Sequence, residues 1–90
     1  MPYITQKRRK ALHGRAKPDN PGDLNYLITD LIGKYCEKWG LSYIIINDVI
    51  GALECAKMEF YRRMVGPYEE GRIMDNGDIP FYEDAERERP

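Results

Sequence analysis

Two stretches of the chain carry apolar residues at three- and four-residue steps. In the first stretch these residues are Leu24, Leu27, Ile28, Leu31, Ile32 and Tyr35. In the second they are Ile46, Val49, Ile50, Leu53, Phe60 and Met64, with Lys57 at an intervening step. This spacing places the side chains along one face of an α-helix. No two segments show the matching two-residue alternation of paired strands, so the sequence predicts an all-α fold.

Capping signals set the ends of the first helix. Asn20 can cap its amino end, and Pro21 suits the first helical position. Gly40 can supply the left-handed residue that ends a helix. These signals predict a helix over 21–39.

The second helix is predicted to follow almost at once. Ser42 is a plausible cap, and the apolar spacing continues over 43–65. Gly66-Pro67 then breaks or kinks the helix, because proline lacks the amide donor. Extra helical turns are expected up to residue 74. Two helices joined by a short turn favour an antiparallel helical hairpin.

The two helices also resemble each other in sequence. The segment Thr29–Gly33 aligns with Asn47–Gly51, and each helix has a glycine in its interior. A mid-helix glycine costs about 1 kcal/mol relative to alanine. Three explanations are open: close approach of helices within the hairpin or between subunits, an ancient internal repeat, or a ligand that contacts the helix backbone. Close packing is the simplest.

Charge divides the chain into three parts. Residues 1–19 form a basic arm with no acidic residue before Asp19, 20–75 form the helical core, and 76–90 form an acidic tail. The ends are expected to be irregular, apart from a short helix that would end near Gly14. Three interpretations compete for the charged ends: solvated termini, a head-to-tail contact between copies, or an arm that binds nucleic acid. The nucleic-acid arm is less favoured.

Several classes of protein are not supported. Cys36 and Cys55 form no CxxC pair, and His13 is the single histidine, so free buried thiols are expected and no metal site. Catalytic motifs are missing, which predicts a non-enzymatic protein without a cofactor. The sequence contains neither a signal peptide nor an apolar run of about 20 residues, so a soluble cytoplasmic protein is expected. A chain of 90 residues has a marginal core, which predicts a homo-oligomer.

The candidate site lies on the second helix. Its proposed ligand-binding residues are Tyr61, Arg62, Arg63, Asn47 and Glu54. Arginine forks match phosphate geometry, and tyrosine can stack on a base, so these residue types suit an anionic ligand such as a nucleotide. The competing interpretation is an exposed ion pair between Glu59 and Arg63, four residues apart.

The chain resembles a family of short uncharacterised proteins from phages and prokaryotic genomes. The resemblance rests on "MPYI" at 1–4, "LNYLIT" at 24–29, "INDVIGALE" at 46–54, "EFYRR" at 59–63 and "PYE" at 67–69, followed by "NGD" at 76–78. It marks a set of polar positions as candidate sites, namely Asn25, Asn47, Asp48, Glu54, Arg62 and Arg63. It also implies an accessory protein that acts by stoichiometric binding, in the host cytoplasm if the gene belongs to a phage.

Two functions are therefore predicted. The first is an oligomeric, non-enzymatic accessory protein that binds or sequesters a small anionic ligand, such as a nucleotide signal. The alternative is a protein-binding inhibitor or structural adaptor that acts on a host protein. A membrane role is not expected.

Overall fold

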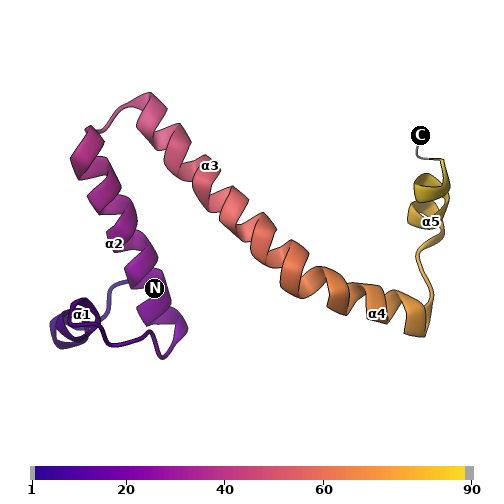
Figure 1. The fold of residues 1–90 in the computed structure, drawn as a ribbon, viewed down its shortest axis with the longest axis horizontal. Helices are drawn as coiled ribbons and strands as arrows, with labels where there is room; N and C mark the ends of the chain where they lie inside the picture. Colours follow the sequence, from indigo (N-terminus) through magenta and orange to yellow (C-terminus); the bar gives the residue numbers. More distant parts are fainter. Residues whose placement is uncertain (1, 89–90) are drawn as a thin grey trace. The chain divides into compact units, whose positions relative to one another are not determined.

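The computed structural model describes residues 2–88 of the chain, and this part is helical with no strand. Its elements are α1 (Gln6–His13), α2 (Pro21–Trp39), α3 (Tyr43–Phe60), the π-helical segment η1 (Tyr61–Val65), α4 (Gly66–Asn76) and α5 (Pro80–Arg87) (Figure 1). The predicted all-α fold is confirmed. The chain divides into two compact units, Met1–Ile50 and Gly51–Pro90, with the boundary inside α3.

The first unit is built on a contact between α1 and α2. Asp23 on α2 is 1% exposed, and its Oδ2 accepts hydrogen bonds from Arg8 Nε at 2.9 Å and Arg8 Nη2 at 2.6 Å. The backbone N–H of Asp19 donates to the same oxygen at 3.1 Å. Leu12 on α1, 5% exposed, is the only buried apolar residue among residues 2–88. The paired charges of Arg8 and Asp23 thus join α1 to α2.

The short helix α1 ends where the sequence predicts. The Thr5 hydroxyl accepts from the N–H of Arg8 at 3.2 Å and caps the amino end. The N–H of Gly14 donates to the carbonyl of Lys10 at 2.9 Å and closes the other end. The basic arm therefore contains the short helix that the sequence predicted to end near Gly14.

The boundaries of α2 confirm the prediction of 21–39. Asn20 Oδ1 accepts from the N–H of Asp23 at 2.8 Å, and Pro21 is the first helical residue. Gly40 ends the helix with a φ of +80°, a backbone angle that only glycine adopts without strain. Local side-chain and backbone chemistry is sufficient to define this helix.

The packing of the predicted hairpin is not observed in the first unit. Here α2 forms no helix–helix contact with the part of α3 in this unit, residues 43–50. A Cβ built on Gly33 or Gly51 would meet no atom within 4 Å. A short connection makes two helices neighbours in sequence, but packing requires their apolar faces to cover each other, and Leu31 remains 68% exposed. Close approach among the described residues of its own unit therefore does not explain either glycine.

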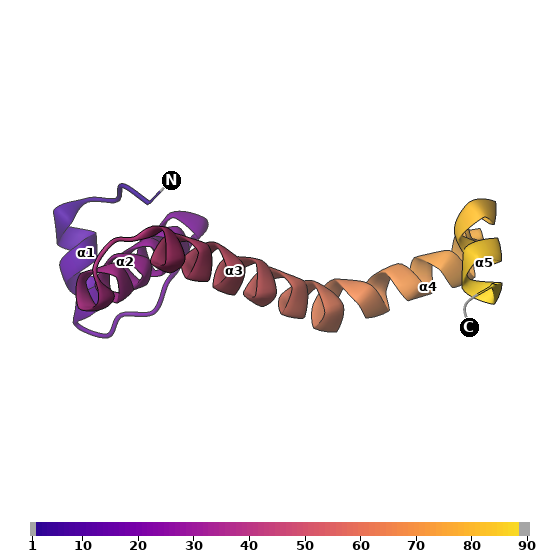
Figure 2. The same ribbon diagram turned by 90° about the horizontal axis from the view of Figure 1, so that it is seen from above.

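The second predicted helix, 43–65, corresponds to α3 and η1, and the expected extra turns correspond to α4. Ser42 caps α3, since its Oγ accepts from the N–H of Ile45 at 3.2 Å. After Phe60 the helix widens to the π form, and α4 follows directly with Pro67 in its first turn. The helical backbone continues past Pro67 to Asn76, two residues beyond the predicted limit of 74 (Figure 2).

The widened segment η1 explains how proline is accommodated. The N–H of Gly66 donates to the carbonyl of Tyr61, five residues earlier. Proline has no N–H to donate, and its ring would clash with the carbonyl four residues before it in a regular helix. A π turn next to the proline relieves that clash, so Gly66-Pro67 changes the helix type and does not end the helix.

The acidic end of the chain is also helical. Pro80 begins α5, and Glu83 Oε1 accepts from Arg87 Nη2 at 2.6 Å one turn later. The prediction of an irregular tail over 76–90 is thus wrong for residues 80–87, because an ion pair at four-residue spacing and a proline at the first position favour a helix.

The structure also tests the predictions for the two cysteines and for membrane-spanning helices. Cys36 and Cys55 are both free, as expected, but Cys36 is half-buried and Cys55 is exposed. No helix among residues 2–88 has both the length and the apolar character to span a membrane.

The buried aspartate predicts a pH dependence of the first unit. Hydrogen bonds from Arg8, and then from the N–H of Asp19, lower the pKa of Asp23 from its ordinary value of 3.8. A carboxyl group with a lowered pKa in the folded state stabilises that state above its unfolded pKa, and this stabilisation is lost as the pH falls through the folded pKa. Amide NMR shifts of α1 should therefore move toward unfolded values as the pH falls below 3.8.

Two matched variants distinguish the effect of the Arg8–Asp23 pair from other effects of low pH on the protein. Asp23→Asn should give the low-pH spectrum of α1 already at pH 7. Asp19→Asn should change it less, because Asp19 pairs with Arg8 at 3.1 Å but is solvent-exposed. An α1 spectrum that is equal in wild type and Asp23→Asn at pH 7 would contradict this role for the pair.

The two mid-helix glycines allow a direct test of helix packing. Gly33→Ala and Gly51→Ala should each raise the free energy of unfolding by about 0.5–1 kcal/mol, because alanine favours helix and the added Cβ meets open space. Thermal unfolding followed by circular dichroism measures the change. A loss of stability together with a smaller oligomer would instead indicate close contact with a second copy.

Candidate functional site

The predicted arginines share one carboxylate in the second unit. Glu59 Oε1 accepts from Arg62 Nη2 at 2.8 Å and from Arg63 Nε at 2.5 Å, and Glu59 Oε2 accepts from Arg62 Nε at 3.3 Å. We call these three residues the Glu59 cluster. The expected pair between Glu59 and Arg63 is confirmed, and Arg62 adds a second, forked pair.

The cluster carries a net positive charge. Hydrogen bonds from Arg62, and then from Arg63, lower the pKa of Glu59, so the carboxylate is ionised at neutral pH. Two guanidinium groups face this single negative charge, and all three side chains are exposed. One positive charge therefore remains for another anion.

The π-helical segment η1 contains the three central residues of the predicted site. Tyr61, Arg62 and Arg63 are its first three residues, and the Tyr61 ring is exposed. Short π-helical segments in proteins occur often at functional sites, because the widened turn redirects side chains. The sequence contained a signal for the distortion in Pro67, but it did not specify the π form.

The other two predicted residues do not join this group. Asn47 belongs to the first unit. Glu54 is exposed, and its Oε1 lies 3.9 Å from Nζ of Lys57, one turn along α3. Neither residue hydrogen-bonds to the Glu59 cluster, and none of the five predicted residues lines either of the two pockets described below.

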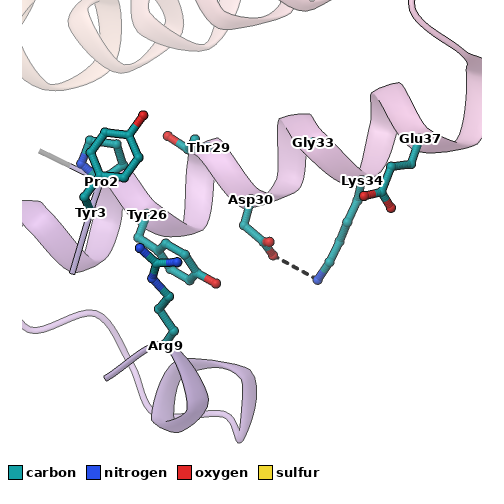
Figure 3. A pocket seen from close by; sticks show the side chains of 9 residues that line it. All are labelled: Pro2, Tyr3, Arg9, Tyr26, Thr29, Asp30, Gly33, Lys34 and Glu37. Carbon is teal, nitrogen blue, oxygen red and sulfur yellow. Dashed lines mark ion pairs between the residues drawn. The ribbon is translucent and has the colours of Figure 1, made fainter. Parts of the chain in front are cut away.

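A pocket that the sequence did not reveal lies in the first unit, along α2 (Figure 3). It has a volume of about 360 Å³. Its lining residues are Pro2, Tyr3, Arg9, Tyr26, Thr29, Asp30, Gly33, Lys34 and Glu37. We call it the α2 pocket. The basic arm supplies one end of it, and α2 supplies the rest.

Aromatic and charged contacts order the arm end of the α2 pocket. Arg9 Nε donates to the carbonyl of Ile4 at 3.1 Å, and the guanidinium carbon lies 5.3 Å from the centre of the Tyr26 ring. The Tyr26 hydroxyl lies 2.7 Å from Nε2 of His13 on α1. The Tyr26 ring is thus held between α1 and α2, with a guanidinium on its face.

In the middle of the α2 pocket, the wall is formed by a glycine of α2 and by an ion pair next to it. Gly33 exposes the helix backbone to the pocket, and Lys34 Nζ pairs with Asp30 Oδ2 at 3.0 Å. The one sequence signal for this pocket was the mid-helix glycine, for which a ligand on the backbone was among the three explanations.

A second pocket, of about 560 Å³, lies in the second unit, and its lining residues come from the range 69–86. Acidic side chains predominate among its charged residues, namely Glu69, Glu70, Asp78 and Glu86, with Arg72 as the cation. No group of three metal-ligating side chains occurs close together in the part of the chain that the structure describes.

Comparison with known proteins identifies one family. The model of a family described as a domain of unknown function (DUF6899) matches residues 1–79. The match includes both units up to the residue before α5. No curated protein and no solved structure matches the chain.

Proposed function

The chain belongs to this family of unknown function (DUF6899), and we propose that it is a phage-type accessory protein that binds a small anionic ligand without catalysis. In this proposal the protein works as a homo-oligomer in the cytoplasm and sequesters its ligand. The ligand is an anion with a planar group, of which a nucleotide is the clearest example.

The observation that carries the proposal is the Glu59 cluster. Two guanidinium groups on one carboxylate leave one positive charge without a partner in the cluster. Guanidinium forks bind phosphate with paired hydrogen bonds, and Tyr61 offers a ring that can stack on a base. Their common position on a π-helical segment supports a binding role.

A protein-binding adaptor is the second candidate, and the exposed apolar residues of α2 favour it. Leu24, Leu31 and Trp39 on this helix are each more than half exposed. Large exposed apolar surfaces are commonly interaction sites. In this case the chain would act on a host protein through a helix face, and the arginines would contribute little.

Arginine variants test the anionic ligand. Arg62→Ala combined with Arg63→Ala should reduce affinity for ATP at least tenfold in calorimetric titrations, because both forks are removed. Arg72→Ala is the matched control, since Arg72 is an exposed arginine in the same unit and outside the cluster. Equal ATP titrations for wild type and the double variant would contradict the proposal and favour the adaptor.

Removing the shared carboxylate should have the opposite effect. Glu59→Gln removes the negative charge of the cluster, so its net charge rises from one positive charge to two. The affinity for ATP should therefore rise about three- to fivefold at low salt. Coulomb's law gives this change for the removal of one negative charge roughly 5 Å from a phosphate charge in water. The gain should shrink at high salt because exposed charges are screened. An unchanged or weaker affinity at low salt would show that the ligand does not approach the cluster.

A further inference from the structure

The α2 pocket has the features of a ligand site that is separate from the Glu59 cluster. It lies wholly in the unit Met1–Ile50 and shares no residue with the cluster. We infer that it binds a planar aromatic molecule that carries one carboxylate or phosphate group. This inference rests on the pocket's own residues and does not depend on the proposed function.

The glycine at the centre of the pocket is the first argument. Gly33 lies in the interior of α2, where glycine destabilises a helix relative to alanine. No other described residue of this unit occupies the space, since a Cβ at Gly33 would have no neighbour within 4 Å outside its own helical turn. Gly33 instead lines the pocket, with no side chain between the helix backbone and the pocket (Figure 3).

The guanidinium of Arg9 is the second argument. Its Nε is occupied by the carbonyl of Ile4, while its terminal nitrogens have no hydrogen-bond partner among residues 2–88. The group is also fixed in place against Tyr26. A forked donor that is already oriented suits a carboxylate or phosphate, because little conformational freedom is lost on binding.

The aromatic rings at the same end indicate a planar ligand. Tyr3 lines the pocket and is 78% exposed, so its ring remains available for stacking. Pro2 lies next to it on the wall (Figure 3). An aromatic molecule could thus stack on Tyr3 while its anionic group pairs with Arg9.

The charges along α2 determine the orientation in which the ligand would bind. Lys34 is paired with Asp30, so Arg9 is the cation without an ion pair among the described residues that line the pocket. Glu37 lines the pocket further along α2 (Figure 3). An ionised carboxylate has hydrogen-bond acceptors and no donor. The preferred ligand therefore has its anionic group toward Arg9 and an N–H or O–H donor toward Glu37. The volume of about 360 Å³ is in the range of small-molecule sites.

Two probes distinguish the sources of the anionic group. Adenosine 5′-monophosphate carries a phosphate and 4-aminobenzoate carries a carboxylate, and in both molecules a planar ring separates the anionic group from an amino group. Each is titrated into ¹⁵N-labelled full-length protein, with uncharged adenosine as the reference. Shifts of the Gly33 amide with at least one anionic probe, and weaker shifts with adenosine, are expected. The probe that binds more tightly identifies phosphate or carboxylate as the preferred group.

A matched pair of glycine variants tests the position of the site. Gly33→Leu should fill the pocket and weaken binding of the active probe at least tenfold. Gly51→Leu places the same side chain in the interior of α3, where a Cβ also meets open space, and should leave binding unchanged. Circular dichroism checks that both variants keep their helices.

Arginine variants separate this site from the Glu59 cluster. Arg9→Lys keeps the charge but removes the fork, and should weaken binding in the α2 pocket. Arg62→Ala combined with Arg63→Ala should leave it unchanged. The inference is overturned if neither probe shifts Gly33 at millimolar concentration, or if Gly33→Leu binds the active probe as well as Gly51→Leu does.

Discussion

The ion pair between Arg8 and Asp23 is the interaction on which the first unit depends. Asp23 is almost fully buried, and Arg8 satisfies it with two hydrogen bonds. If one partner of a buried ion pair is removed, the other charge is left buried without a partner, which is strongly destabilising. This contact therefore determines whether α1 docks on α2. Arg9 follows Arg8 in sequence, and the pair therefore also sets the position of the guanidinium at the α2 pocket.

The two candidate sites differ in what holds them. The α2 pocket needs the docked arm, because Pro2, Tyr3 and Arg9 come from outside α2. The Glu59 cluster needs only its own helix, since its pairs join residues three and four apart. Loss of α1 docking would therefore dismantle the pocket and leave the cluster in place, which makes the two sites experimentally separable.

The similar segments around Gly33 and Gly51 have different surroundings. Gly33 lines the α2 pocket, whereas Gly51 lines neither of the two pockets described above. Neither glycine is in close contact with another described segment of its own unit. The explanation from close packing therefore remains a prediction only for contacts between subunits, and a ligand on the backbone gains support at Gly33 alone.

The sequence by itself determined α2 and α3, the caps at their ends and the ion pair between Glu59 and Arg63, but not α5 or the π form of η1. Asn20, Ser42 and Gly40 act on backbone groups within four residues, so their effect can be read from spacing. Only the tertiary structure decided that Tyr3, Arg9 and Gly33 line one pocket, and that the apolar faces of the two long helices do not pack in the first unit. Contacts between residues far apart in sequence depend on how whole helices dock. The docking here includes a buried charge pair and the contacts of His13 and Arg9 with Tyr26, none of which apolar spacing reveals.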